Sequence, residues 1–409
     1  MLLNPYINLG NTNAKELHLD SKLQRLLYLA TGFARFTQFD TSTTHITTIP
    51  DGEPMNEYVA KCMLLLSRSD LDHVIRRIAI KNLTKLCTNH PRLFYSKHIL
   101  KLMDSEFKSK HLDIQLVILE SFYDFLIKEE KSGLSKSGEN SYRTSNKHSS
   151  RPPKGNQMKE FLNDGVSSGL VTRYLQSILK ICLLSDFKNA LGAIRLLKLI
   201  LEYGYTIPSH CIPTVVALLS SPNLYVRKVT SGIFTTLMEK YETMVYSGLP
   251  KGILMGIKYS RNCEPTNYYK FDKFFLLLQK NMTTSKGSVA KFNKRLFSTI
   301  DMILGACLNE ATMNENIHLI LFISTNITNI KFQDQYELLA FIKKIDAKSE
   351  QLKEIAYSHG KMNVDTNELI ENSSLKANVR DMIISSVSLQ QLQKYLINLY
   401  SLKEDVLLY

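Results

Sequence analysis

The stretch "DLDHVIRRIAIKNLTKL", residues 70–86, carries the pattern that decides the fold. Its apolar residues recur with the spacing i, i+4, i+8 and i+11, and they are Ile75, Ala79, Leu83 and Leu86. This spacing brings the four side chains onto one face of an α-helix, the face that a helix buries. The stretch therefore predicts an amphipathic helix with one buried stripe.

The cations of the same stretch occupy the other face of this helix. Arg77, Lys81 and Lys85 also repeat every four residues, but they come two positions after the apolar stripe, roughly 200° around the helix. Asp72 precedes the helix, where an N-cap carboxylate is favourable, and the dipeptide at 90–91 contains the proline that ends it. We therefore expect a helix with a buried face and a basic face.

The same arrangement recurs along the chain. Further helices start near Asp113, Asp186 and Asn223, which gives intervals of 41 residues from Asp72 to Asp113 and 37 from Asp186 to Asn223. A shorter apolar helix precedes each one, and pairs of helices with a period near 40 residues are typical of HEAT-type repeats. One pair cannot bury its apolar face alone, so such pairs stack into a solenoid. We predict an all-α fold, a HEAT-repeat α-solenoid that is curved or hook-shaped; an irregular helical bundle with accidental spacing is the alternative.

The chain divides into six predicted segments. They are an N-terminal helical segment (1–54), HEAT repeats (55–130), a disordered basic insertion (131–159), HEAT repeats (160–246), basic and then mixed HEAT-like helices (247–360), and a C-terminal helical cap (361–409). The insertion holds seven Lys/Arg residues and one acid, and it lacks the apolar residues that a core needs. A tether to nucleic acid, a phosphorylation target, a nuclear import signal and a solvated loop all fit that composition. Later helices are expected at 270–281, 288–309, 313–328 and 335–356.

The charge of the chain is unevenly distributed. The 409 residues carry a net charge of +13. Residues 301–409 hold 10 Lys/Arg and 14 Asp/Glu, which leaves 41 Lys/Arg and 24 Asp/Glu, a net of +17, for residues 1–300. Such an asymmetry indicates a polyanionic partner for the basic part, although many basic proteins bind no specific polyanion.

Motifs for catalysis, metal binding and secretion are missing from the sequence. It has no phosphate-binding Gly-x4-Gly-Lys-Ser/Thr, no His-Glu-x-x-His and no Gly-x-Ser-x-Gly. No two of the six cysteines have the Cys-x-x-Cys spacing, and most lie within apolar periods, which indicates buried free thiols. We expect a protein that is not an enzyme, with no cofactor, no metal and no membrane span.

The stretch at 251–275, "KGILMGIKYSRNCEPTNYYKFDKFF", interleaves basic and aromatic residues. Residues 247–300 contain ten Lys/Arg and only two acids. Basic side chains contact phosphates, and aromatic rings either stack on bases or fill a core. The alternative is that the aromatic residues belong to the solenoid core and the lysines to a solvated face. Three glycines with GxxxG spacing (Gly248, Gly252 and Gly256) indicate a turn and a close helix contact in a soluble chain.

The second helix of each HEAT pair lines the concave side of the solenoid. We therefore expect the basic faces of these helices to line a groove that contacts phosphates, interrupted in the repeat at Asp113 by Glu120 and Asp124; the alternative is that some of the groove binds protein. The candidate DNA contacts are Arg77, Lys81, Lys85, Lys188, Arg195, Arg227, Lys228, Lys251, Lys258, Arg261, Lys270 and Lys273.

Several stretches resemble one known family in their order along the chain. "DGVSSGLVTRYLQSILKICLL", "PSHCIPTVVALLSSPNLYVRKVTSGIFTTLMEKY", "GLPKGILMGIKYS" and "HLILFISTNITNIKFQDQYELLAFIKKID" look like the C-terminal HEAT region of the cohesin loader, the Nipped-B (adherin) family of sister chromatid cohesion proteins. The resemblance runs from about Glu57 to Ile355 and is budding-yeast-like.

The resemblance implies a large hook-shaped protein of the nucleus that is associated with chromosomes. Members of this family bind double-stranded DNA and the cohesin complex, including its ATPase heads and kleisin, and they stimulate the cohesin ATPase for loading onto chromatin. A small loader partner subunit binds an N-terminal segment of the family that is missing here. The alternative is a HEAT-repeat nuclear transport or trafficking adaptor that binds protein cargo; such receptors are generally acidic, unlike residues 1–300.

Overall fold

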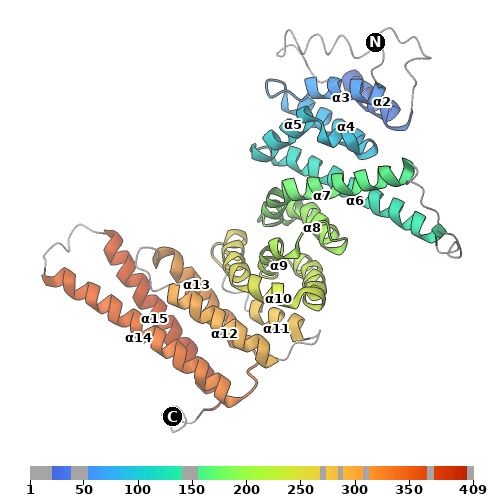
Figure 1. Cartoon of the computed structure of the whole chain (residues 1–409). Helices are drawn as coiled ribbons and strands as arrows, with labels where there is room; N and C mark the ends of the chain where they lie inside the picture. The colour runs from blue at the N-terminus through green and yellow to red at the C-terminus, as the bar shows by residue number, and fades with distance from the viewer. Residues whose placement is uncertain are drawn as a thin grey trace. The chain divides into compact units, whose positions relative to one another are not determined.

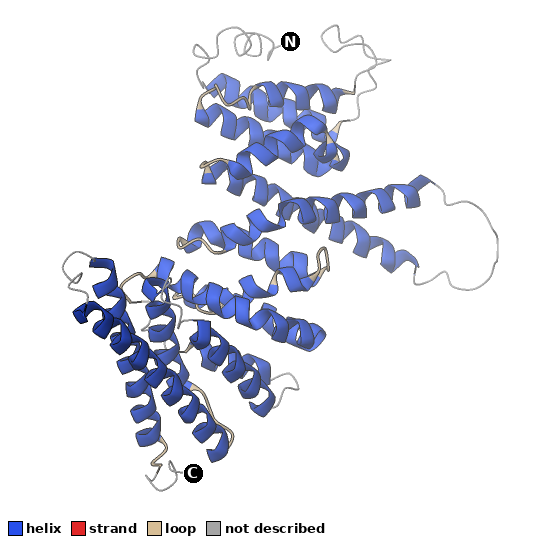
Figure 2. Ribbon diagram, turned by 60° about the vertical axis from the view of Figure 1, so that its left-hand side comes forward, coloured by secondary structure: helices blue, strands red, loops and turns tan. Residues whose placement is uncertain are grey.

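The structure is a computed structural model that describes residues 21–37, 54–140, 155–267, 273–283, 289–306, 313–365 and 373–402. No strand occurs within these ranges (Figure 2). The helices are α2 (Ser21–Phe36), α3 (Met55–Leu65), α4 (His73–Asn89), α5 (Lys97–Lys108), α6 (Leu112–Asn140), α7 (Gly155–Cys182), α8 (Phe187–Glu202), α9 (Ile212–Leu218), α10 (Leu224–Cys263), α11 (Phe274–Thr283), α12 (Val289–Ala306), α13 (Met313–Asn326), α14 (Gln335–Asp365) and α15 (Ser373–Leu399), with short 3-10 turns at Pro91–Tyr95, Pro208–His210 and Ile327–Asn329.

The predicted all-α class is confirmed, and neighbouring helices pack side by side as in a helical repeat fold (Figure 1). The described residues fall into two compact units, one within Met1–Ile181 and Leu191–Thr206 and the other within Cys182–Ala190 and Ile207–Tyr409. The unit boundary therefore lies inside the segment 160–246 that the sequence predicts as one run of repeats. The predicted curvature of the solenoid stays a prediction.

Helix α4 has the structure that its sequence predicts. The Asp72 carboxylate accepts hydrogen bonds from the backbone N–H groups of Val74 and Ile75, at 2.8 and 3.3 Å, so it caps the helix. The four residues of the apolar stripe, 75 to 86, are all fully buried. The helix ends before His90, where the proline at 91 starts a 3-10 turn.

The second helices of later pairs, α8 and α10, begin with the same kind of N-cap. Asp186 accepts from the backbone N–H of Lys188 at 3.0 Å, and Asn223 accepts from that of Tyr225 at 2.9 Å. Asp113 differs, because it lies inside α6, which starts at Leu112.

Aromatic side chains fill the cores of both units. In the first unit Phe94 packs on Phe125, with ring centroids 5.3 Å apart, and Phe122 packs on Tyr174 of α7 at 5.6 Å. In the second unit Phe274 and Phe275 are fully buried, as expected, and both rings contact Phe322. Long-range contacts between these rings hold each stack of helices together.

The predicted disordered insertion, 131–159, is helical at both of its ends. Helix α6 continues to Asn140 and α7 begins at Gly155, so 141–154 alone lie outside the described residues. Both helices extend beyond the packed part of the repeat as a hairpin (Figure 2). A helix needs no apolar core to continue once its packed part is formed, because propagation adds one hydrogen bond for each residue that is ordered.

Three glycines let α9 and α10 approach closely. Helix α10 is kinked at Tyr241, which has φ −137° and ψ 41°, and its second segment packs on α9. A Cβ on Gly248 would lie 2.6 Å from Cγ2 of Ile212, and one on Gly252 would lie 2.6 Å from Cβ of Val216. The predicted close helix contact is therefore confirmed, while the predicted turn is wrong because these glycines lie inside the helix.

Gly252→Ala is expected to destabilise the chain by about 1–3 kcal/mol, because the added methyl group overlaps buried Val216. Gly232→Ala is the matched control in the same helix, since nothing lies within 4 Å of its Cβ position. The control should gain up to about 1 kcal/mol from helix propensity. Urea unfolding followed by circular dichroism measures both, and equal stability of the two variants would contradict the close contact.

Candidate functional site

The arginine of the basic face of α4 is paired with a carboxylate. Nε of Arg77 lies 3.3 Å from Oδ2 of Asp113, and Nε2 of His73 lies 2.9 Å from the same oxygen. Burial opposes ionisation of Asp113, but the hydrogen bond from His73 and the charge of Arg77 outweigh it and hold the pKa of Asp113 below its usual value. Arg77 is therefore partly neutralised, and it is a poor candidate for a phosphate contact.

The two lysines of this face lie in a mixed electrostatic environment. Lys81 and Lys85 are half-buried. Burial and the charge of Glu120 raise the pKa of Asp124, whereas the charge of Lys85 lowers it, so this lysine lies near an acid of α6. The predicted basic lining stays a prediction.

Five candidates in or next to α10 and α11 are exposed cations. Lys251, Lys258 and Arg261 are spaced i, i+7 and i+10 along the second segment of α10, so they share one face of that helix. Lys228, on the first segment, and Lys273, next to α11, are also exposed. Within the described ranges, none of these five side chains has an ion pair with a carboxylate.

The two candidates of α8 are exposed as well. Lys188 and Arg195 are seven residues apart and therefore lie on the same face of the helix. Arg195 belongs to the first compact unit, and Lys188 to the second.

Arg227 has a structural role instead. Its Nη1 donates to the backbone carbonyls of Ser221 and Pro222, at 2.6 and 2.8 Å, and burial lowers its pKa. Arg76 takes the corresponding place after its own N-cap, and its Nε donates to the carbonyl of Ser67 at 3.4 Å. Arginine at this position fastens the second helix of a pair to the loop before it.

Tyr259 is the one interleaved aromatic residue of 251–275 that the structure describes, and its ring is not available for stacking. Tyr259 is 3% exposed, and its hydroxyl donates to Oγ of Ser221 at 3.3 Å, so it belongs to the core. Burial raises its pKa. Lys270 and the neighbouring aromatic residues at 268, 269 and 271 lie outside the described residues.

Groups that could hold a metal ion gather at one place in the described ranges. The ligand atoms of His73, His111 and Asp113 all lie within 4.8 Å of one another. Because the guanidinium of Arg77 lies beside the same carboxylate oxygen, a cation already balances the charge that would attract a metal. We interpret this cluster as an ion-pair network between the starts of α4 and α6.

Three buried cysteines have thiols of raised pKa. Burial raises the pKa of the Cys87 and Cys182 thiols, and it raises that of Cys211 to about 12. These thiols are protonated at neutral pH, so they behave as small apolar side chains.

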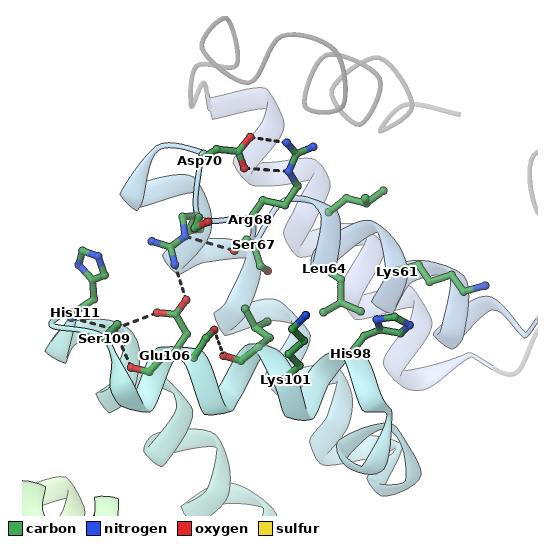
Figure 3. A pocket seen from close by; sticks show the side chains of 15 residues that line it. Lys61, Leu64, Ser67, Arg68, Asp70, His98, Lys101, Glu106, Ser109 and His111 are labelled. Carbon is green, nitrogen blue, oxygen red and sulfur yellow. Dashed lines mark hydrogen bonds and ion pairs between the residues drawn. The ribbon is translucent and has the colours of Figure 1, made fainter.

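A groove that the sequence analysis missed lies between the first helices of two consecutive pairs (Figure 3). We call it the α3–α5 groove. It has a volume of about 990 Å³ and is lined by Lys61, Leu64, Leu65, Ser67, Arg68, Ser69, Asp70, Arg76, His98, Lys101, Leu102, Ser105, Glu106, Ser109 and His111. The sequence carries one signal for this groove, the adjacent leucines Leu64 and Leu65 of α3. A helix that packs through one apolar stripe does not need both of them.

A buried ion pair forms the base of this groove. Nη2 of Arg76 lies 2.5 Å from Oε1 of Glu106, and the two side chains are 8% and 3% exposed. Oγ of Ser109 donates to Oε2 of Glu106 at 3.4 Å. The pair fixes α4 against α5 and so sets the shape of the groove (Figure 3).

Comparison with known proteins gives a consistent result. Residues 167–348 match the profile of the Nipped-B family described as "Sister chromatid cohesion C-terminus". The chain is 44% identical over 407 residues to Sister chromatid cohesion protein 2 of Saccharomyces cerevisiae, and 25% identical over 172 residues to Sister chromatid cohesion protein mis4 of Schizosaccharomyces pombe. Residues 167–348 therefore match the Nipped-B family, and the chain as a whole is similar to sister chromatid cohesion proteins. The resemblance drawn from the sequence is thereby confirmed.

A solved structure shares the fold of this chain. The C-terminal fragment of the Chaetomium thermophilum cohesin loader SCC2 matches with a TM-score of 0.67 and 15% identity, over 98% of this chain and 32% of that one. The alignment with the S. cerevisiae relative covers 99% of this chain and 27% of the relative. The chain thus spans about a quarter to a third of the length of these proteins.

The segment matched by the Nipped-B profile contains most of the candidate cations. Those of α8, α10 and α11 lie between 167 and 348, whereas Arg77, Lys81, Lys85 and the α3–α5 groove lie before it. Among the described helices, none combines the length and apolarity that crossing a bilayer requires.

Arg76→Met is expected to destabilise the chain by about 3–5 kcal/mol, because it leaves the Glu106 carboxylate buried without its partner. The double variant Arg76→Met/Glu106→Met removes both charges and should recover most of this loss. Urea unfolding of the two variants and the parent tests the pair. If the single and double variants lost the same stability, the coupling between the two side chains would be refuted.

Proposed function

We propose that this chain is part of a scaffold for loading cohesin onto chromatin. The observation that carries the proposal is the 44% identity with Sister chromatid cohesion protein 2, which extends over 99% of the chain. The fold supports it too, because the structural match covers 98% of the chain. The same identity favours this role over the alternative of a transport or trafficking adaptor.

The scaffold acts by binding rather than by catalysis. It holds double-stranded DNA and the cohesin complex, through the ATPase heads and kleisin, and thereby stimulates the cohesin ATPase. It works in the nucleus, associated with chromosomes, and a small loader partner subunit binds an N-terminal segment of the family. The chain itself needs no cofactor for this role.

The DNA contacts of the proposal are exposed cations, most of them in the second unit. Lys251, Lys258 and Arg261 form the centre, because they share one helix face and have no carboxylate partner in the described ranges. Four further candidates are included because they are exposed too: Lys188, Arg195, Lys228 and Lys273. The half-buried Lys81 and Lys85 are secondary candidates. Such side chains contact phosphates, so binding is largely independent of DNA sequence and weakens as salt rises.

Three of the original candidates are omitted from these contacts, and one of them, Lys270, lies outside the described residues. Arg77 is paired with Asp113, and Arg227 is bound to backbone carbonyls. Both would have to give up an existing partner before they could contact a phosphate.

The cohesin role is tested with purified cohesin and duplex DNA. We expect immobilised chain to retain cohesin, and added chain to raise the rate of ATP hydrolysis in the presence of DNA. The adaptor control is a transport receptor of similar size, which should do neither. Failure of this chain both to retain cohesin and to stimulate hydrolysis would contradict the proposal.

Lys251→Glu/Lys258→Glu/Arg261→Glu is expected to weaken binding to a 40-base-pair duplex at least about tenfold. The plot of log affinity against log salt should also become less steep by about 3, roughly one for each phosphate that the variant no longer neutralises. Fluorescence anisotropy between 50 and 200 mM salt measures both quantities.

The matched control is Lys331→Glu/Lys343→Glu/Lys394→Glu, which makes the same change of net charge at exposed lysines outside the candidate set. The control should retain most of the affinity. An equal loss in the two triple variants would show that total charge, and not the α10 face, determines binding.

A further inference from the structure

We propose that the α3–α5 groove is a docking site for an acidic amphipathic peptide segment of a partner protein. Apolar side chains of the segment would pack on the leucines of the floor, and its carboxylates would pair with the cations of the rim. This inference is independent of the DNA-binding role, because none of the lining residues belongs to the DNA candidates.

The two walls of the groove present matching helical stripes. On α3, the residues that face the groove are Lys61, Leu64 and Leu65, spaced i, i+3 and i+4. On α5, His98, Lys101, Leu102, Ser105 and Glu106 continue the same spacing over two turns. Figure 3 shows Lys61, His98 and Lys101 along the part of the groove where α3 and α5 face each other.

The floor is apolar and already formed. Leu64, Leu65 and Leu102 are half-exposed, so occupation of the groove would remove apolar surface from water. The polar groups beneath them are satisfied within the fold, since Arg76 and Glu106 pair with each other and Oγ of Ser67 donates to the carbonyl of Met63 at 2.6 Å. A ligand would therefore meet a preformed surface and would need no rearrangement of the base.

The charge of the rim selects an acidic ligand. The lining contains four Lys/Arg residues and two acids. Each acid forms an ion pair with an arginine of the lining: Glu106 pairs with Arg76, and Asp70 pairs with Arg68 at 2.5 Å. Together with its two histidines the lining has more basic than acidic groups, so carboxylates of a ligand would complement its net charge.

The size of the groove fits a short helix. From His98 to Glu106 the α5 wall rises eight residues, about 12 Å or two helical turns. That length accepts one set of anchors at i, i+3, i+4 and i+7, as in helix-in-groove recognition. DNA is a poorer occupant, because phosphates would leave the leucine floor uncovered.

The first test is selection from a phage-displayed library of random 16-residue peptides against the whole chain. Phage that also bind the Leu102→Glu variant are removed, since this substitution places a carboxylate in the floor. We expect the selected peptides to be acidic and to carry apolar residues at helical spacing. Failure to enrich any peptide, or enrichment of basic or purely polar peptides, would overturn the proposal.

The second test measures the affinity of the most enriched peptide by fluorescence anisotropy. Lys61→Glu/Lys101→Glu should weaken binding at least tenfold. Lys97→Glu/Lys108→Glu is the matched control, because it makes the same charge change on exposed residues that do not line the groove, and it should change affinity less than twofold. Circular dichroism of each variant confirms folding.

Two competition results complete the test. A version of the peptide with its apolar residues changed to serine should not bind. If that version bound as tightly as the original, the groove would recognise charge alone, and the proposal would be overturned. A 40-base-pair duplex should not displace the peptide from the groove at 150 mM salt. The proposal would be overturned in favour of DNA if the duplex displaced the peptide from the parent chain and the Lys61→Glu/Lys101→Glu variant lost binding of both the duplex and the peptide.

Discussion

A pair of short helices cannot bury its apolar stripe by itself, and this constraint governs the whole chain. Each second helix, such as α4, hides its stripe only because the neighbouring helices cover it, and the stripe at Ile75 is consequently inaccessible to solvent. The outer faces of the helices are then the surfaces left for recognition. Both proposed binding surfaces lie there, one built from exposed charge and the other from a gap between neighbouring helices.

Local features of the fold were predictable from the sequence because their causes are local. Asp72 lies within three residues of the N–H groups that it caps, and Ile75 and Ala79 are one turn apart. The neutralisation of Arg77 was not predictable, since Asp113 approaches this helix from a repeat that begins 40 residues beyond His73. Helical spacing shows which way a cation points, but it does not show which carboxylate the next repeat brings to it.

The α3–α5 groove was not predictable for the same reason. Its shape depends on Arg76 and Glu106, which are 30 residues apart and belong to different helix pairs. In the sequence Arg76 looks like one more cation beside Arg77. The structure gives the two neighbours opposite roles, because one faces the interior of the stack and the other faces solvent.

The two proposed surfaces differ in physical character, and salt should separate them. Lys251, Lys258 and Arg261 act through exposed charges alone, and a bound polyanion releases its counterions, so their contribution falls steeply as salt rises. Binding in the α3–α5 groove would combine rim charges with packing on leucines, and the apolar part is not screened. A chain that has lost DNA at high salt would therefore still retain a peptide partner, which would let one protein release chromatin while it stays attached to another component.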